Sequence, residues 1–120
     1  MANYNIWVGV PSYEAHYVGT LRNVTRNYAL DYAEELMREE YENVAGLHGI
    51  PSYNDIYEEL IEYYAAELKS GEYDESDIEY FATEQYEEEI NNWGSYYAHD
   101  ESGDQTFYEC YDDSKKFYLN

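Results

Sequence analysis

Apolar residues near the start of the chain recur at every second position, which is the pattern of a β-strand. In residues 3–10 this alternation runs from Ile6 onward and predicts a strand that ends at Pro11. Residues 15–24 form a second run of the same kind, and we expect the two strands to pair. Gly19 lies inside the second run and indicates a bulge.

The middle of the chain changes to apolar residues at three- and four-residue spacings, which is typical of amphipathic helices. Ser52 with Asp55, and Ser76 with Glu79, match the capping box that begins many helices. Glycines follow each periodic run, as they commonly do past a helix end. We therefore expect three helices, over residues 27–45, 52–69 and 76–93.

The C-terminal part is aromatic and rich in turn residues. It predicts a strand over residues 95–99, a solvated turn over residues 100–104 and a strand over residues 105–111, to which residues 115–119 can add another strand outside the main order. The predicted order is β-β-α-α-α-β-β, an α+β fold with a small antiparallel sheet and about three amphipathic helices on one face. No linker rich in Pro, Gly or Ser interrupts the chain, so we expect a single domain over residues 1–120.

The charge of the chain narrows the possible functions. The 120 residues contain 27 Asp and Glu against 6 Lys and Arg, a net charge of −21. A negatively charged protein cannot replace the counterions of nucleic acid, and an anionic lipid surface repels it, so neither contributes favourable free energy of binding. We therefore expect no direct nucleic acid partner and no membrane partner. The 18 Tyr, 3 Phe and 2 Trp supply enough apolar area for a compact core, which argues against disorder.

The sequence carries few signs of catalysis or of a metal site. GxSxG, Gly-rich phosphate-loop, HExxH and CxxC motifs are absent, and the three histidines stand alone. Cys110 lies beside Glu109, whose charge disfavours a thiolate. We expect no enzyme activity, no cofactor and no metal. An enzyme that uses the Asp100–Asp104 turn with a divalent ion stays open as a rival, because that turn offers oxygen ligands.

The acidic residues gather after residue 33, where the whole excess of charge lies. The densest stretch holds eight acids in sixteen residues, from Asp74 to Glu89. As a helix it would span about 24 Å, or roughly one charge per 3 Å, close to the ~3.4 Å spacing along a DNA strand. The alternative is a solvated acidic face, but solubility needs only about 2–8 charges. The residues that we expect to bind a partner are Glu58, Glu59, Glu62, Asp74, Glu75, Asp77, Glu84, Glu87 and Glu88.

Tyrosine is too abundant for every copy to be in the core, and Tyr is favoured at protein interfaces. We expect some of the tyrosines to lie near the acidic residues; the candidates are Tyr57, Tyr63, Tyr73, Tyr80 and Tyr97.

Two short regions resemble the ArdA-type antirestriction proteins. Ile6-Trp7-Val8, followed by Tyr13 and then Val18-Gly19, is similar to the opening strand, loop and second strand of that family, and Ser102-Gly103-Asp104 followed by Phe107 and Tyr108 is similar to its C-terminal end. The chain is shorter than a full three-part ArdA protein. The resemblance implies an elongated, acid-surfaced dimer that occupies the DNA groove of a restriction enzyme. Acidic anti-CRISPR proteins fit the same charge pattern.

These observations predict an acidic inhibitor from a phage or mobile element that mimics nucleic acid. It would occupy the basic DNA- or RNA-binding channel of a defence nuclease, of restriction or CRISPR type, in the host bacterial cytoplasm. A possible homodimer follows from the exposed aromatics that need cover. The alternative is a non-enzymatic phage structural or adaptor protein that binds partners through its aromatic surface.

Overall fold

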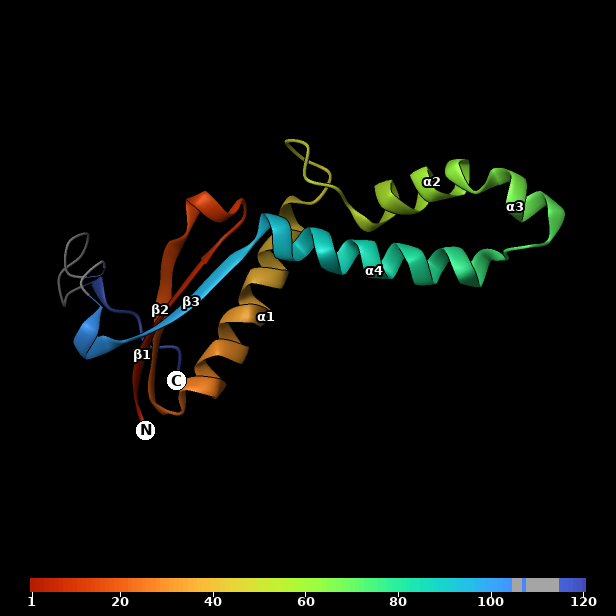
Figure 1. Ribbon diagram of the computed structural model, residues 1–120. Helices are drawn as coiled ribbons and strands as arrows, with labels where there is room; N and C mark the ends of the chain where they lie inside the picture. Colours follow the sequence, from red (N-terminus) through yellow and green to blue (C-terminus); the bar gives the residue numbers. More distant parts are fainter. Residues whose placement is uncertain (105–106, 108–114) are drawn as a thin grey trace. The chain divides into compact units, whose positions relative to one another are not determined.

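The computed structural model describes residues 1–104, 107 and 115–120, and its internal contacts form two compact units. One unit comprises Met1–Tyr41 with Gly94–Asn120 and is called the sheet unit below. The other comprises Glu42–Trp93 and is called the helical unit. Strands and helices are both present, which confirms the predicted α+β class (Figure 1).

The sheet unit is built on an antiparallel sheet. Its strands are β1 (Ala2–Gly9), β2 (His16–Val24) and β3 (Ser95–Asp100), and β1 lies in the middle. A short 3-10 turn, η1 (Ser12–Glu14), connects β1 to β2. Within the described ranges the sheet has three strands, and the predicted pairing of the first two strands is confirmed.

The predicted bulge lies next to Gly19. Ile6 pairs with Gly19 and Trp7 with Tyr17, so Val18 is an extra residue on β2. A Cβ at Gly19 would lie 2.5 Å from the Cγ of Leu119, and the backbone there has φ +155°. Glycine is therefore needed at the point where the C-terminal residues meet β2.

Helix α1 (Arg26–Val44) covers one face of the sheet in Figure 1, and it confirms the helix predicted over residues 27–45. Its buried side chains recur every fourth residue, at Ala29, Ala33, Met37 and Tyr41. Alternate residues of the strands supply the other half of this core, and they include Ile6, Val8, Leu21 and Ala98. Sequence periodicity therefore identified this helix, whereas the burial of Met37 and Tyr41 was not predicted.

The helical unit contains α2 (Tyr53–Tyr63), α3 (Ala65–Ser70) and α4 (Glu75–Trp93). The prediction of one helix over residues 52–69 was wrong, because the backbone leaves the helical region at Tyr64 (φ −100°, ψ 22°). The described residues therefore contain four α-helices instead of about three. The break accompanies contacts of the Tyr64 ring with Tyr73 and Phe81, at centroid distances of 5.3 and 5.5 Å.

The two longer helices of this unit begin at different kinds of cap. Ser52 and Asp55 form the predicted capping box of α2. For α4 the prediction was wrong by two residues: Asp74 and Asp77 exchange side-chain to backbone hydrogen bonds, at 3.1 and 3.0 Å. Ser76 donates instead to the Asp74 carboxylate. A carboxylate already placed before the first turn takes the capping role from the serine inside it.

Helices α2 and α4 pack side by side in opposite directions, with α3 at the closed end (Figure 1). Ile56, Ile78 and Ala82 are fully buried in this unit. Tyr53 packs edge-on against Tyr86. The unit is therefore a helical hairpin with an aromatic and aliphatic core.

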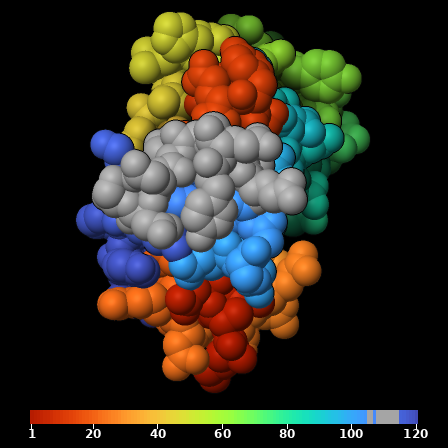
Figure 2. Space-filling model, turned by 90° about the vertical axis from the view of Figure 1, so that its left-hand side faces the viewer, coloured from red at the N-terminus to blue at the C-terminus, as the bar shows by residue number. Residues whose placement is uncertain are grey.

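The turn predicted at residues 100–104 is not wholly solvated. Residues Glu101–Gly103 form a 3-10 turn, η2, that contacts β1. In Figure 2 the light-blue residues of this part of the chain lie beside the red N-terminal residues. Asp104 is buried, with 3% of its surface exposed, because its carboxylate accepts hydrogen bonds from Asn5 and Trp7. A polar turn residue can be buried when hydrogen-bond donors from distant parts of the chain satisfy its side chain.

The remaining C-terminal predictions are tested only in part. The strand expected over residues 105–111 lies outside the described residues apart from Phe107, which is buried. In place of a strand over residues 115–119 there is a single parallel bridge between Thr20 and Tyr118. Thr20 donates to the Phe117 carbonyl and Leu119 donates to the Thr20 carbonyl, so these residues extend the β2 edge.

Candidate protein-binding surface

The helical unit carries most of the negative charge. Residues 42–93 contain fifteen Asp and Glu against the single basic residue Lys69, a net charge of −14 out of −21. One lysine can neutralise few of these carboxylates. The field of the unit is therefore strongly negative wherever its acids face solvent.

On α2 the predicted residues form a compact row. Glu58, Glu59 and Glu62 are all exposed, and helical geometry places them on one side. Ile56 and Leu60 lie on the opposite side, where Ile56 is buried. Asp55 lies on the same exposed side. It was not predicted as a binding residue because its position in the capping box already accounted for it. We call Asp55, Glu58, Glu59 and Glu62 the α2 row; it places four carboxylates along about 10 Å of helix.

On α4 the acids divide between two faces. Asp77, Glu84, Glu87 and Glu88 lie on the side away from the buried Ile78, Ala82 and Ile90, and we call them the α4 row. They span about 16 Å of helix, or roughly one charge per 4 Å. Two other acids of the dense stretch lie outside this row, and the sequence analysis did not select them: Glu79 is exposed and lies near Tyr57, and Glu89 is half-buried and accepts from the Trp93 indole at 3.0 Å.

Asp74 and Glu75 lie at the start of α4, outside the α4 row, because Glu75 is three residues before Ile78 and so on the same side of the helix. Asp74 is exposed, and its hydrogen bonds from Ser76 and from the Asp77 backbone hold its pKa below the usual value. Carboxylates at this position also interact favourably with the positive end of the helix. These two predicted residues therefore have a stabilising role in the helix whatever they bind.

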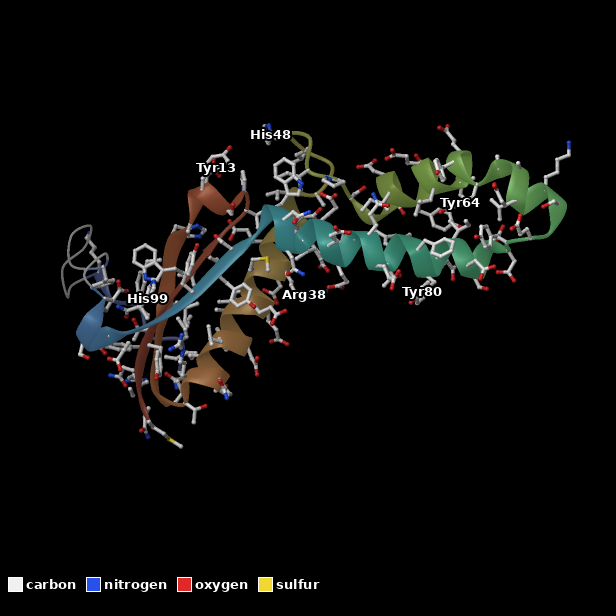
Figure 3. All side chains as sticks on the ribbon, viewed as in Figure 1. Tyr13, Arg38, His48, Tyr64, Tyr80 and His99 are labelled. Carbon is white, nitrogen blue, oxygen red and sulfur yellow. The ribbon has the colours of Figure 1, made fainter. Side chains whose placement is uncertain are left out.

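The two rows do not join into one surface. Each row lies mainly opposite the packed side of its own helix, so the α2 row and the α4 row face away from each other, although Glu59, at one edge of the α2 row, also approaches Gln85 of α4. In Figure 3, Tyr64 lies between the two helices and Tyr80 lies on the outer side of α4. Seven of the nine acids predicted as partner-binding residues therefore form two outward rows on the two sides of the hairpin, and Asp74 and Glu75 lie outside both rows.

Tyrosines accompany both rows. Tyr80 is exposed, and its hydroxyl donates to Glu84 at 2.9 Å; this hydrogen bond raises the pKa of Tyr80. Tyr63 is 76% exposed and lies on the α2 side. Tyr57 and Tyr73 are half-buried. Desolvation, followed by the charges of Glu75 and Glu79, raises the pKa of Tyr57. Tyr97 is on β3, in the sheet unit.

Sequence analysis missed a hollow between α2 and α4. It has a volume of about 330 Å³ and is lined by Glu59, Leu60, Tyr63, Tyr64 and Gln85. The first four residues follow the helical spacing of α2, which is a local signal that groups them. Gln85 reaches them only through the packing of α4 on α2, so no local signal predicts the hollow.

The Asp100–Asp104 turn uses its carboxylates for separate hydrogen bonds. Asp100 accepts from the backbone and the hydroxyl of Ser102, which lowers the pKa of Asp100. Asp104 points to Asn5 and Trp7 instead. Among the residues that the structure describes, no group of three or more His, Cys, Asp and Glu is arranged to hold a metal ion.

Comparison with protein-family models, with curated proteins and with solved structures finds no match to this chain. In the described part of the chain, no helix is long and apolar enough to cross a membrane.

Proposed function

We propose that this protein binds the basic nucleic-acid channel of a partner protein, and that the two acidic rows of the helical unit stand in for the strands of a duplex. The observation that carries the proposal is the arrangement of the rows on opposite outer sides of one hairpin. Duplex DNA also carries its two charged strands on the outside, with about 3.4 Å between charges along each strand. The spacings of roughly 3 and 4 Å per charge along the two helices are similar.

Carboxylates suit this role chemically. A carboxylate accepts the two parallel N–H groups of an arginine, as a phosphate does. A rigid helical frame holds the charges in place before binding, which reduces the ordering cost of association. The net charge of −14 on this unit attracts a basic channel over a long range and speeds the encounter at low salt.

A defence nuclease of restriction or CRISPR type is the partner that we propose, and the inhibitor then competes with DNA or RNA for its channel. The test measures displacement of a labelled duplex from purified restriction and CRISPR nucleases as the protein is added, at low and at high salt. We expect displacement that weakens as salt rises. Lysate pull-downs at the same two salt concentrations identify further targets.

Two triple variants probe the rows. One replaces Glu58, Glu59 and Glu62 by Gln, and the other replaces Glu84, Glu87 and Glu88 by Gln. A matched control replaces Glu14, Glu35 and Glu39, which are exposed acids of the sheet unit, so the total charge changes equally. We expect each row variant to lose at least about tenfold in potency, given roughly 0.5–1 kcal/mol for each exposed ion pair. Equal potency of row and control variants would refute the proposal.

The exposed aromatics favour a second candidate, a structural or adaptor protein. Tyr13, Tyr63 and Tyr80 have 83%, 76% and 61% of their surface exposed, and large exposed aromatics commonly mark protein interfaces. This candidate predicts binding that survives high salt and fails when the tyrosines are truncated. The salt series above therefore separates it from the charge-based proposal.

A further inference from the structure

We infer that the hollow between α2 and α4 is a binding site for one arginine side chain of the partner protein. The inference rests on the proposed function for the identity of that partner, and it names the group that the hairpin recognises. The site is lined by Glu59, Leu60, Tyr63, Tyr64 and Gln85, and we call it the Glu59 pocket.

The rim of the Glu59 pocket offers a carboxylate beside an aromatic ring. Glu59 and Tyr63 are four residues apart on α2, so they are neighbours on its surface. Both are exposed, and Tyr63 is among the most exposed aromatics of the described chain. A guanidinium can donate two N–H groups to a carboxylate while its flat face lies on a tyrosine ring.

The inner wall of the pocket supplies apolar surface and one amide. Leu60 and Tyr64 are half-buried, and the Tyr64 ring is fixed against Tyr63, Tyr73 and Phe81. They can contact the methylene groups of a long side chain. The Gln85 side chain makes no hydrogen bond within the described part of the chain, so its carbonyl oxygen can accept a further N–H.

Charge favours a cation over the other possible occupants. The pocket lies in a unit with one Lys and fifteen acids, which opposes an anion. The Oε2 atom of Glu67, one turn after Tyr63 on α3, is buried without a hydrogen-bond partner and adds to the negative field. An apolar occupant would remove water from Glu59 and Gln85 without replacing their hydrogen bonds.

The same features favour arginine over lysine. Arginine is planar, weakly hydrated and able to donate five N–H groups, which matches acceptors on two walls and an aromatic rim. The lysine ammonium is a compact, strongly hydrated point charge that cannot stack on a ring. A volume of about 330 Å³ admits one long side chain.

The test titrates the isotope-labelled full chain with the peptide acetyl-Gly-Arg-Gly-amide and follows the NMR shifts. Peptides with lysine or citrulline in place of arginine are the matched probes, since citrulline keeps the shape without the charge. We expect the largest shifts at Tyr63, Tyr64 and Gln85 with the arginine peptide. Binding of the other two peptides is expected to be at least about threefold weaker. Equal affinity for all three, or shifts spread over both acidic rows, would overturn the inference.

Two single variants of equal charge sharpen the test. Glu59→Gln is expected to weaken binding of the arginine peptide by about threefold to tenfold. This range lies between the effect of losing an exposed ion pair and that of losing a charge-assisted hydrogen bond. Glu72→Gln removes one exposed acid of the same unit outside the pocket, and we expect a change below about twofold. Equal losses for both variants would mean diffuse attraction and no pocket.

The nuclease competition assay separates this inference from the proposed function. Suppose that Glu59→Gln no longer binds the arginine peptide but displaces nucleic acid with the same potency as the unchanged protein. The pocket then does not anchor the partner, and this inference fails while the proposed function stands. If the unchanged protein displaces no nucleic acid from the nucleases while the arginine peptide still binds at the Glu59 pocket, the proposed function fails and the site for an arginine side chain stands.

Discussion

The indole N–H of Trp7 donates to the carboxylate of Asp104 at 2.8 Å, although 97 residues separate the two in sequence. Both side chains are buried. The same carboxylate accepts from the Asn5 amide at 3.1 Å and from the backbone N–H of Phe107 at 3.2 Å. Asp104 therefore ties the C-terminal residues to the middle strand of the sheet.

A second set of bonds continues from Asn5 across the sheet. The Thr20 hydroxyl donates to the Asn5 side chain at 2.7 Å and lies 2.5 Å from the Tyr17 hydroxyl. Tyr17 in turn accepts from the backbone N–H of Phe117 at 3.2 Å. The sheet unit thus contains a continuous polar network between two strands and the C-terminal residues.

Asp104→Ala is expected to destabilise the protein strongly. It leaves three donors near Asn5, Trp7 and Phe107 without an acceptor, and each buried unsatisfied group costs about 1–3 kcal/mol. We expect a loss of at least about 2 kcal/mol in the free energy of unfolding, measured by urea denaturation with tryptophan fluorescence. Asp31→Ala, at an exposed acid of α1, should change it by less than about 0.5 kcal/mol. Similar losses for the two variants would show that Asp104 is not held as described.

Gly19→Ala is expected to destabilise the contact between β2 and the C-terminal residues. The added methyl would lie 2.5 Å from the Cγ of Leu119, and overpacking of this kind costs about 1–3 kcal/mol. Leu119→Ala removes the clash, so the cost of Gly19→Ala should fall in that background. A double-mutant cycle on the free energy of unfolding measures this coupling. Additive effects would contradict the close approach of the two residues.

The α2 cap is expected to make part of the stability depend on pH. Hydrogen bonds from the Ser52 backbone and hydroxyl lower the pKa of Asp55 below its usual value of 3.8. A lowered folded-state pKa contributes stability above the unfolded-state value, and this contribution is lost as pH falls through the folded-state value. The stability difference between the unchanged protein and Asp55→Ala should therefore be constant from pH 7 to pH 5. It should shrink below about pH 4, as followed by thermal melts. A difference that grows on acidification would reverse the assigned sign.

Glu88→Lys is expected to stabilise α4 while it weakens partner binding. Glu84 and Glu88 are four residues apart on one exposed side, and like charges at this spacing cost about 0.2–0.5 kcal/mol. A glutamate followed four residues later by a lysine stabilises a helix by a similar amount. We therefore expect an increase of up to about 1 kcal/mol in the free energy of unfolding at low salt. At 1 M salt the gain should largely vanish, since the Debye length falls to about 3 Å. A gain that is unchanged in high salt would mean that it is not electrostatic.

The sequence by itself determined the local elements of this protein. The period of two around Ile6 and the spacing of Ala29, Ala33 and Leu36 are enough to identify strand and helix, because burial imposes these periods on side chains of one face. The same logic predicted that Glu58 and Glu84 are exposed. Ser52 and Asp55 predicted a helix start because a capping box is formed within four residues.

Tertiary structure decided the features that depend on distant residues. The local sequence predicts that Asp104 is a solvated turn residue, but in the fold its carboxylate accepts hydrogen bonds from Trp7 and Asn5. Gln85 lines the same pocket as Glu59 only because α4 packs on α2. The helix break at Tyr64 and the opposite directions of the two acidic rows have the same origin. Periodicity reports which side of an element is buried, whereas the partner of that side is chosen by long-range packing that no local pattern encodes.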